Sequence, residues 1–136
     1  MKLNLRVMLI IAAVYWLGNG LMALIVPPEM LGAKPDDSKF LVMTMRFWGV
    51  ASLPLGLIAW MIRNAEPSKT RDAVVLSFTF FFILEAVVSL YGATIDPNSP
   101  HVAFGVLEAF IGVGFIYAGR SSMTRSADKG PAVIPG

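Results

Sequence analysis

Four long stretches of the chain are almost free of charged side chains, and they limit the folds that the sequence can adopt. They cover residues 7–26, 40–62, 73–93 and 102–119. The first stretch contains no charged residue, and the others contain one each: Arg46, Glu85 and Glu108. Because about 20 apolar residues form a helix that crosses the hydrocarbon core of a bilayer, the pattern predicts four transmembrane helices.

A soluble helical bundle is the alternative, and the residue pattern argues against it. Helices of soluble bundles have a polar face that recurs about every 3.6 residues, whereas the run Phe78–Leu84 shows none. Charged residues make up 15% of the chain, against about 25% in soluble domains. The first stretch follows Lys2 and Arg6, as in a signal peptide, but its apolar run is longer than signal peptides have. We therefore expect it to persist as a helix.

The segments between the predicted helices are short and rich in turn-forming residues. Pro27 and Pro28 end the first helix because proline lacks the backbone N–H. Short connections favour antiparallel neighbours, so the expected fold class is all-α: one domain over residues 1–120 with four transmembrane helices in an up-down-up-down bundle. Residues 121–136 are rich in Ser, Gly, Pro and mixed charge, which predicts a disordered cytoplasmic tail.

The distribution of basic residues predicts the orientation of the bundle, because cytoplasmic loops carry an excess of Lys and Arg. With both termini in the cytoplasm, that side holds eight basic residues and the opposite side two. The eight are Lys2, Arg6, Arg63, Lys69, Arg71, Arg120, Arg125 and Lys129, and the two are Lys34 and Lys39. We therefore expect a multi-pass protein of a bacterial inner membrane with cytoplasmic N- and C-termini.

Four polar side chains within the predicted spans fall at a common depth. Asn19, Arg46, Glu85 and Glu108 each lie six to eight residues from the outer end of their span, or roughly 10 Å below the boundary. Such residues are unfavourable in hydrocarbon unless they face one another or a cavity. We therefore expect one polar cluster in the outer half of the bundle. One arginine cannot neutralise two carboxylates, so a cationic ligand or a proton is favoured there.

Four further residues are candidate accessory residues of this cluster. Ser89 lies one turn from Glu85 in the third stretch. His101 lies at the outer mouth of the fourth, where it could sense pH, although a histidine in a loop is usually only solvated. The first stretch adds Tyr15 and Trp16.

Glycines recur on the faces that carry two of the charged residues. Gly105, Gly112 and Gly119 share a face of the fourth stretch, and Gly49 and Gly56 lie two turns apart in the second. Small residues let a neighbouring helix approach closely, so these faces are expected to pack against other helices.

The sequence lacks the side chains that most enzymatic and redox chemistry requires. It contains no cysteine and one histidine, which excludes disulfides, thiolate metal sites and a bis-histidine haem within one chain. It has no phosphate-binding loop, HExxH or GxSxG motif, and a net charge of +2 without a basic stripe does not indicate nucleic-acid binding. We expect no catalytic residue, no metal and no cofactor.

Three short runs carry a resemblance to a known class of proteins. They are Arg46–Gly49 and Leu55–Leu57, preceded by a first helix that ends in Leu24–Glu29. In these runs and in its hydropathy the chain resembles small bacterial four-helix membrane proteins of the DoxX-like type. The resemblance implies a four-helix inner-membrane fold and carries over no catalytic residue.

Three functions remain open. In the leading hypothesis, a non-enzymatic protein of the lipid bilayer binds a small amphipathic or cationic ligand at the polar cluster. In the second, the cluster is a structural clasp and the chain is an accessory or scaffold subunit of a larger membrane complex or homo-oligomer. The third is a small proton-coupled transporter. It would need a polar path to the inner face, where the sequence offers only Tyr15, Ser52, Ser77 and Thr79.

Overall fold

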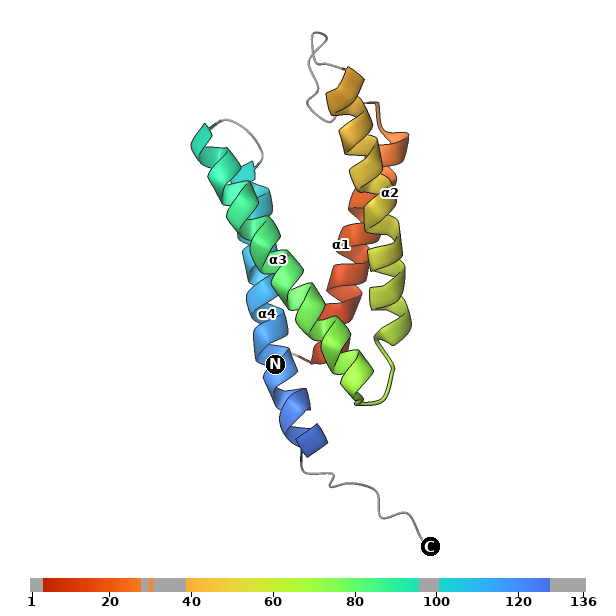
Figure 1. The fold of residues 1–136 in the computed structure, drawn as a ribbon, viewed down its shortest axis with the longest axis vertical. Helices are drawn as coiled ribbons and strands as arrows, with labels where there is room; N and C mark the ends of the chain where they lie inside the picture. Colours follow the sequence, from red (N-terminus) through yellow and green to blue (C-terminus); the bar gives the residue numbers. More distant parts are fainter. Residues whose placement is uncertain (1–3, 28–29, 31–38, 96–100, 128–136) are drawn as a thin grey trace, which may run out of the picture. The chain divides into compact units, whose positions relative to one another are not determined.

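The computed structural model describes residues 4–27, 30, 39–95 and 101–127. Within these ranges the chain forms four α-helices (Figure 1): α1 (Leu5–Ile25), α2 (Lys39–Ile62), α3 (Lys69–Ile95) and α4 (His101–Ala127). Each of them contains a stretch that is long and apolar enough to cross a membrane. The prediction of four such helices is confirmed, and they suggest a multi-pass membrane protein.

All four helices begin before their apolar stretches, by one to four residues, and in α1 and α3 a polar side chain caps the first turn. The Asn4 Oδ1 accepts a hydrogen bond from the Arg6 backbone N–H at 3.2 Å. The Ser68 Oγ accepts one from the Arg71 backbone N–H, also at 3.2 Å. Such caps satisfy N–H groups of the first turn that have no carbonyl partner in the helix. Helix α3 therefore starts at Lys69 instead of residue 73.

Helix α4 is longer than its apolar stretch predicts. It continues through Ala127, so residues 121–127 are helical and not part of a disordered tail. The physical reason is the sequence of these residues, which contains neither glycine nor proline, the usual signals that end a helix. The remainder of the predicted tail, residues 128–136, lies outside the described residues.

The chain divides into two compact units. One is Leu9–Arg63, which contains most of α1 and all of α2. The other joins Met1–Met8 to Asn64–Gly136 and contains α3 and α4. The single domain over residues 1–120 and the up-down-up-down order of the four helices stay predictions.

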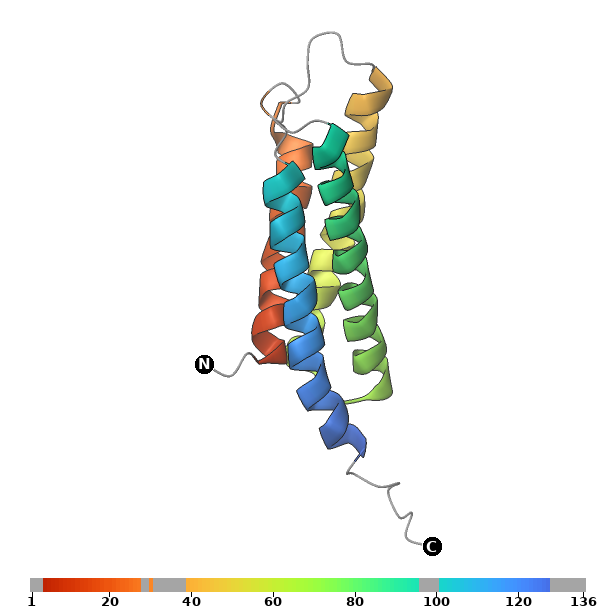
Figure 2. The same cartoon turned by 90° about the vertical axis from the view of Figure 1, so that its left-hand side faces the viewer.

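Helices α1 and α2 run side by side in antiparallel directions (Figures 1 and 2). A Cβ atom at Gly20 would lie 2.9 Å from the carbonyl oxygen of Gly49, and one at Gly56 would lie 2.9 Å from the backbone nitrogen of Leu17. From Leu17 to Gly20 in α1, the facing residue in α2 moves back from Gly56 to Gly49, so the two helices are antiparallel. The two backbones approach so closely because glycines line the seam, as the spacing of Gly49 and Gly56 predicts.

Helices α3 and α4 form a second antiparallel hairpin, which both views show as a pair of adjacent helices (Figures 1 and 2). A Cβ atom at Gly105 would lie 2.8 Å from the Leu90 Cγ, and one at Gly112 would lie 2.8 Å from the Ile83 Cδ1. The predicted small-residue face of α4 is therefore confirmed as the face that packs on α3.

Candidate functional site

The predicted polar cluster draws two residues from each hairpin. Asn19 on α1 and Arg46 on α2 belong to one unit, whereas Glu85 on α3 and Glu108 on α4 belong to the other. Within each hairpin the polar groups have definite partners. That all four residues meet in one layer stays a prediction.

Arg46 has a hydrogen-bond partner within its own hairpin. Its Nη1 donates to the backbone carbonyl of Ala23 in α1. In a continuous helix that carbonyl would accept from the N–H of residue 27, but residue 27 is a proline and has no N–H. The last regular bond of α1 runs from the Val26 N–H to the Met22 carbonyl at 3.0 Å. Arg46 therefore supplies the donor that Pro27 removes.

This contact gives Arg46 a role that its charge alone does not reveal. The charge pattern identifies Arg46 as a partner for carboxylates and overlooks Ala23 entirely. The signal that could have found the contact is the position of Pro27, four residues after Ala23. A cation at the C-terminal turn of a helix is also favoured by the helix dipole.

Asn19 lies one turn before Ala23 on α1. Its side-chain Nδ2 is buried and has no hydrogen-bond partner. One turn earlier on the same helix, Tyr15 is half-buried and Trp16 is fully buried. The polar residues predicted for the first helix thus all lie at least partly inside the protein, and Asn19 retains an unused donor.

Ser89 and Glu108 are bonded directly in the α3–α4 hairpin. The Ser89 Oγ donates to the Glu108 Oε2 at 2.8 Å. The Glu108 side chain is only 4% exposed, although it carries a carboxyl group. A hydroxyl that donates to a carboxylate forms one of the stronger kinds of hydrogen bond in proteins. The contact brings a candidate accessory residue and a cluster residue together.

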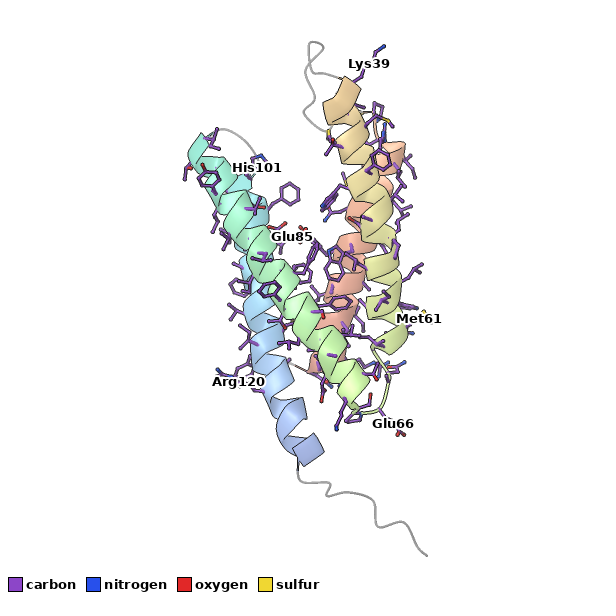
Figure 3. The ribbon with its side chains drawn as sticks, in the orientation of Figure 1. Lys39, Met61, Glu66, Glu85, His101 and Arg120 are labelled. Atoms are coloured by element: carbon purple, nitrogen blue, oxygen red, sulfur yellow. The ribbon has the colours of Figure 1, made fainter. Side chains whose placement is uncertain are left out.

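Glu85 lies one turn before Ser89 on α3 and therefore shares its face. It is the labelled residue midway along α3 in Figure 3. Its carboxyl is within electrostatic range of Glu108, and its Oε2 is buried without a hydrogen-bond donor. Two carboxyl groups thus share one hairpin in apolar surroundings. Like charges repel strongly at low dielectric constant, so a cation or a proton stabilises the pair.

His101 lies at the first residue of α4, away from the carboxyl pair (Figure 3). Its exposed ring rests on α3, where a Cβ atom at Gly92 would lie 3.3 Å from the His101 Cδ2. Seven residues separate it from Glu108, or roughly 10 Å along the helix. His101 therefore marks one end of the hairpin and does not touch the Glu108 carboxyl.

Three of the four hydroxyl groups predicted for a proton path bond within their own helices. Ser52, Ser77 and Thr79 each donate to a carbonyl four residues earlier in their own helix, at 2.9, 2.9 and 2.8 Å. Such back-bonding is common for Ser and Thr in helices and satisfies the hydroxyl without a neighbour or water.

Three aromatic rings fill the interface between α3 and α4 on the side of the carboxyl groups away from His101. Phe82 stacks on Phe115 with ring centroids 6.0 Å apart, and Phe78 meets Phe115 edge-on at 6.3 Å. All three are buried. Because Phe82 lies one turn before Glu85, the interface between α3 and α4 changes from polar to apolar within one turn of the carboxyl groups.

Among the described residues, no group of three or more His, Cys, Asp or Glu side chains could hold a metal ion. Comparisons with protein families, with curated proteins and with solved structures found no match to this chain. The resemblance to DoxX-like proteins therefore stays a prediction, and the function must be argued from the carboxyl pair and its surroundings.

Proposed function

We propose that the protein is a non-enzymatic membrane protein whose α3–α4 hairpin binds the cationic group of a small amphipathic ligand. The observation that carries the proposal is that the buried Glu108 and Glu85 interact electrostatically within one hairpin, and that the Glu85 Oε2 is buried and has no donor among the described residues. A cation would supply the missing positive charge. The apolar surface around the pair suits the hydrocarbon part of an amphipathic molecule.

The charge balance of the apolar stretches supports a cation. They contain one arginine and two glutamates, so one negative charge is left over even if Arg46 neutralises a carboxylate. Arg46 is also bonded to the Ala23 carbonyl, which gives it a structural role in the α1–α2 hairpin. Arg46 thus stabilises the α1–α2 hairpin, while the two glutamates carry one more negative charge than the single arginine can neutralise.

For the orientation, we propose an up-down-up-down bundle in a bacterial inner membrane with both termini in the cytoplasm. The excess of basic residues on that side supports it, and so does the antiparallel packing within each hairpin. At the C-terminal end of α2, the Arg63 guanidinium stacks on the Trp60 ring at 3.6 Å. Aromatic and basic residues of this kind are typical of the membrane–water interface. In this orientation the carboxyl pair lies in the outer half.

The test is to purify the full chain in native lipid nanodiscs and to identify the co-purifying small molecules by mass spectrometry. We expect a cationic amphipathic molecule with the wild type and its loss from Glu108→Gln, which keeps the side-chain volume but removes the charge. Glu66→Gln is the matched control, because Glu66 is exposed and lies outside the apolar stretches. Identical small-molecule content in wild type and Glu108→Gln would contradict the proposal.

The same preparation tests the other two functions. A stoichiometric partner protein without a bound cation would identify an accessory subunit instead. Proton-coupled transport has the least support, because the hydroxyls of Ser52, Ser77 and Thr79 bond to their own helices and three phenylalanines fill the hairpin below the carboxyl groups.

A further inference from the structure

We infer that the cationic group of the ligand carries N–H donors, so that it is a protonated primary or secondary amine and not a quaternary ammonium. The inference rests on the proposed function and specifies the ligand class of the same site. It follows from the hydrogen-bonding state of two oxygen atoms in the α3–α4 hairpin.

The first step is to count the donors that the hairpin shows for these oxygens. The Ser89 hydroxyl has one hydrogen, and it is used on the Glu108 Oε2. The Glu85 Oε2 is shielded from solvent and has no donor among the residues that the structure describes. A buried acceptor without a donor is unfavourable, more so when it carries charge. In the hydrocarbon region no bulk water relieves it.

The second step is to compare the two kinds of cation. A quaternary ammonium neutralises the charge of a carboxylate but has no N–H, so the Glu85 oxygen would stay without a donor. A primary ammonium supplies the same charge and up to three N–H groups, which can donate to Glu85 and to Glu108 at once. Of the two kinds of cation, only one that bears N–H groups therefore supplies both the positive charge and a donor for the Glu85 oxygen.

The phenylalanine next to Glu85 also argues against a quaternary ammonium. Proteins recognise quaternary ammonium groups with aromatic ring faces. Phe82, one turn from Glu85, is stacked on Phe115 with an interplanar angle of 20°. The Phe82 side chain is also fully buried, so its ring is packed inside the protein and the carboxyl oxygens are the recognition groups beside it.

The experiment compares two amphiphiles of equal chain length and charge: dodecylammonium and dodecyltrimethylammonium. Each is titrated into nanodiscs that contain the full-length protein, and bound molecules are counted by native mass spectrometry. Because both amphiphiles also enter the lipid, the double variant Glu85→Gln/Glu108→Gln defines the background. We expect dodecylammonium to bind at least about tenfold more tightly, as one hydrogen bond to a charged group would give. Glu85→Gln should remove most of this preference, whereas Glu66→Gln should leave it unchanged.

The outcomes separate the two claims. Equal site-dependent binding of both amphiphiles would overturn the N–H requirement and leave the cation site standing. Tighter binding of the quaternary amphiphile would overturn it in the same way. Binding of neither amphiphile above the background would overturn the proposed function itself. Far-UV circular dichroism of each variant shows whether its helices are retained, and protein-free nanodiscs of the same lipid give a second background for the wild type that needs no variant to fold.

Discussion

At the scale of single residues, a proline just after α1 and an arginine in α2 compensate for each other. Pro27 removes the N–H that the Ala23 carbonyl would otherwise accept from, and the Arg46 guanidinium replaces it. Without that donor, the carbonyl would be left unsatisfied in apolar surroundings. The arginine is thus explained by a neighbouring backbone group, independently of any carboxylate.

This explanation predicts an energetic coupling between positions 27 and 46. Arg46→Ala should destabilise the protein more in the wild-type background than in Pro27→Ala, where an N–H at position 27 can reach the Ala23 carbonyl. The expected coupling free energy is about 1 kcal/mol, typical of a hydrogen bond between membrane helices. A double-mutant cycle of unfolding in mixed micelles measures it.

Arg46→Ala also removes a charge from the apolar region, which by itself changes stability. Because it does so in both backgrounds, the cycle cancels this effect and leaves the coupling between positions 27 and 46. Lys39→Ala is the control, since Lys39 is exposed at the start of the same helix. A coupling free energy of zero would contradict the compensation.

At the scale of helices, each hairpin is closed by a glycine seam. The space for an added side chain differs strongly between glycines inside the contact and glycines outside it. A Cβ atom at Gly56 would lie 2.6 Å from the Leu17 Cγ and 2.9 Å from its backbone nitrogen. At Gly18, on the same α1–α2 hairpin, a Cβ atom would have no neighbour within 4 Å.

The difference predicts opposite effects of one substitution. Gly56→Ala should lower the free energy of unfolding by about 1–3 kcal/mol, because the extra methyl group forces the two backbones apart. Gly18→Ala should leave it unchanged or raise it by up to about 1 kcal/mol, because alanine favours the helix. Thermal unfolding followed by far-UV circular dichroism checks both. Similar losses for the two variants would show that the seam does not determine the packing.

The helices and their packing faces could be predicted, but several of their ends could not. Apolar stretches locate the helices because hydrocarbon selects for length and composition, and the spacing of Gly105 and Gly112 locates the face that packs on α3. Hydropathy carries no information about caps, so the start of α3 after Ser68 was missed. Composition also failed to predict that residues 121–127 are helical, because the absence of glycine and proline there matters more than their polarity.

At the scale of the whole molecule, the polar groups of the candidate site could be predicted in part. Glu108 and Ser89 follow from polar residues in apolar helices, and the structure joins them in one hydrogen bond. The partner of Arg46 could not be found by looking for complementary side chains, because a backbone carbonyl belongs to every residue. The N–H lost at Pro27 marks the Ala23 carbonyl as a possible partner, but Pro28 marks the Leu24 carbonyl in the same way, so the sequence does not choose between them.

The proposed orientation predicts which loops are reached from each side of the membrane. The chain has no cysteine, so a single introduced cysteine can be labelled without background. A membrane-impermeant maleimide should label Lys39→Cys in intact spheroplasts and Glu66→Cys only after the membrane is permeabilised. Both residues are exposed in the structure. The reverse labelling pattern would invert the orientation, and labelling of both from outside would exclude the up-down order.

The hydrogen bond between Arg46 and Ala23 also bears on the biosynthesis of the protein. Of the four candidate spans in the described chain, the one in α2 is the least apolar, and a lone arginine opposes insertion by the translocon. The ribosome makes α1 first, and this helix carries the carbonyl acceptor for the arginine that follows. Helix α2 therefore enters the bilayer with less penalty beside α1 than alone, which favours insertion of the two as a pair.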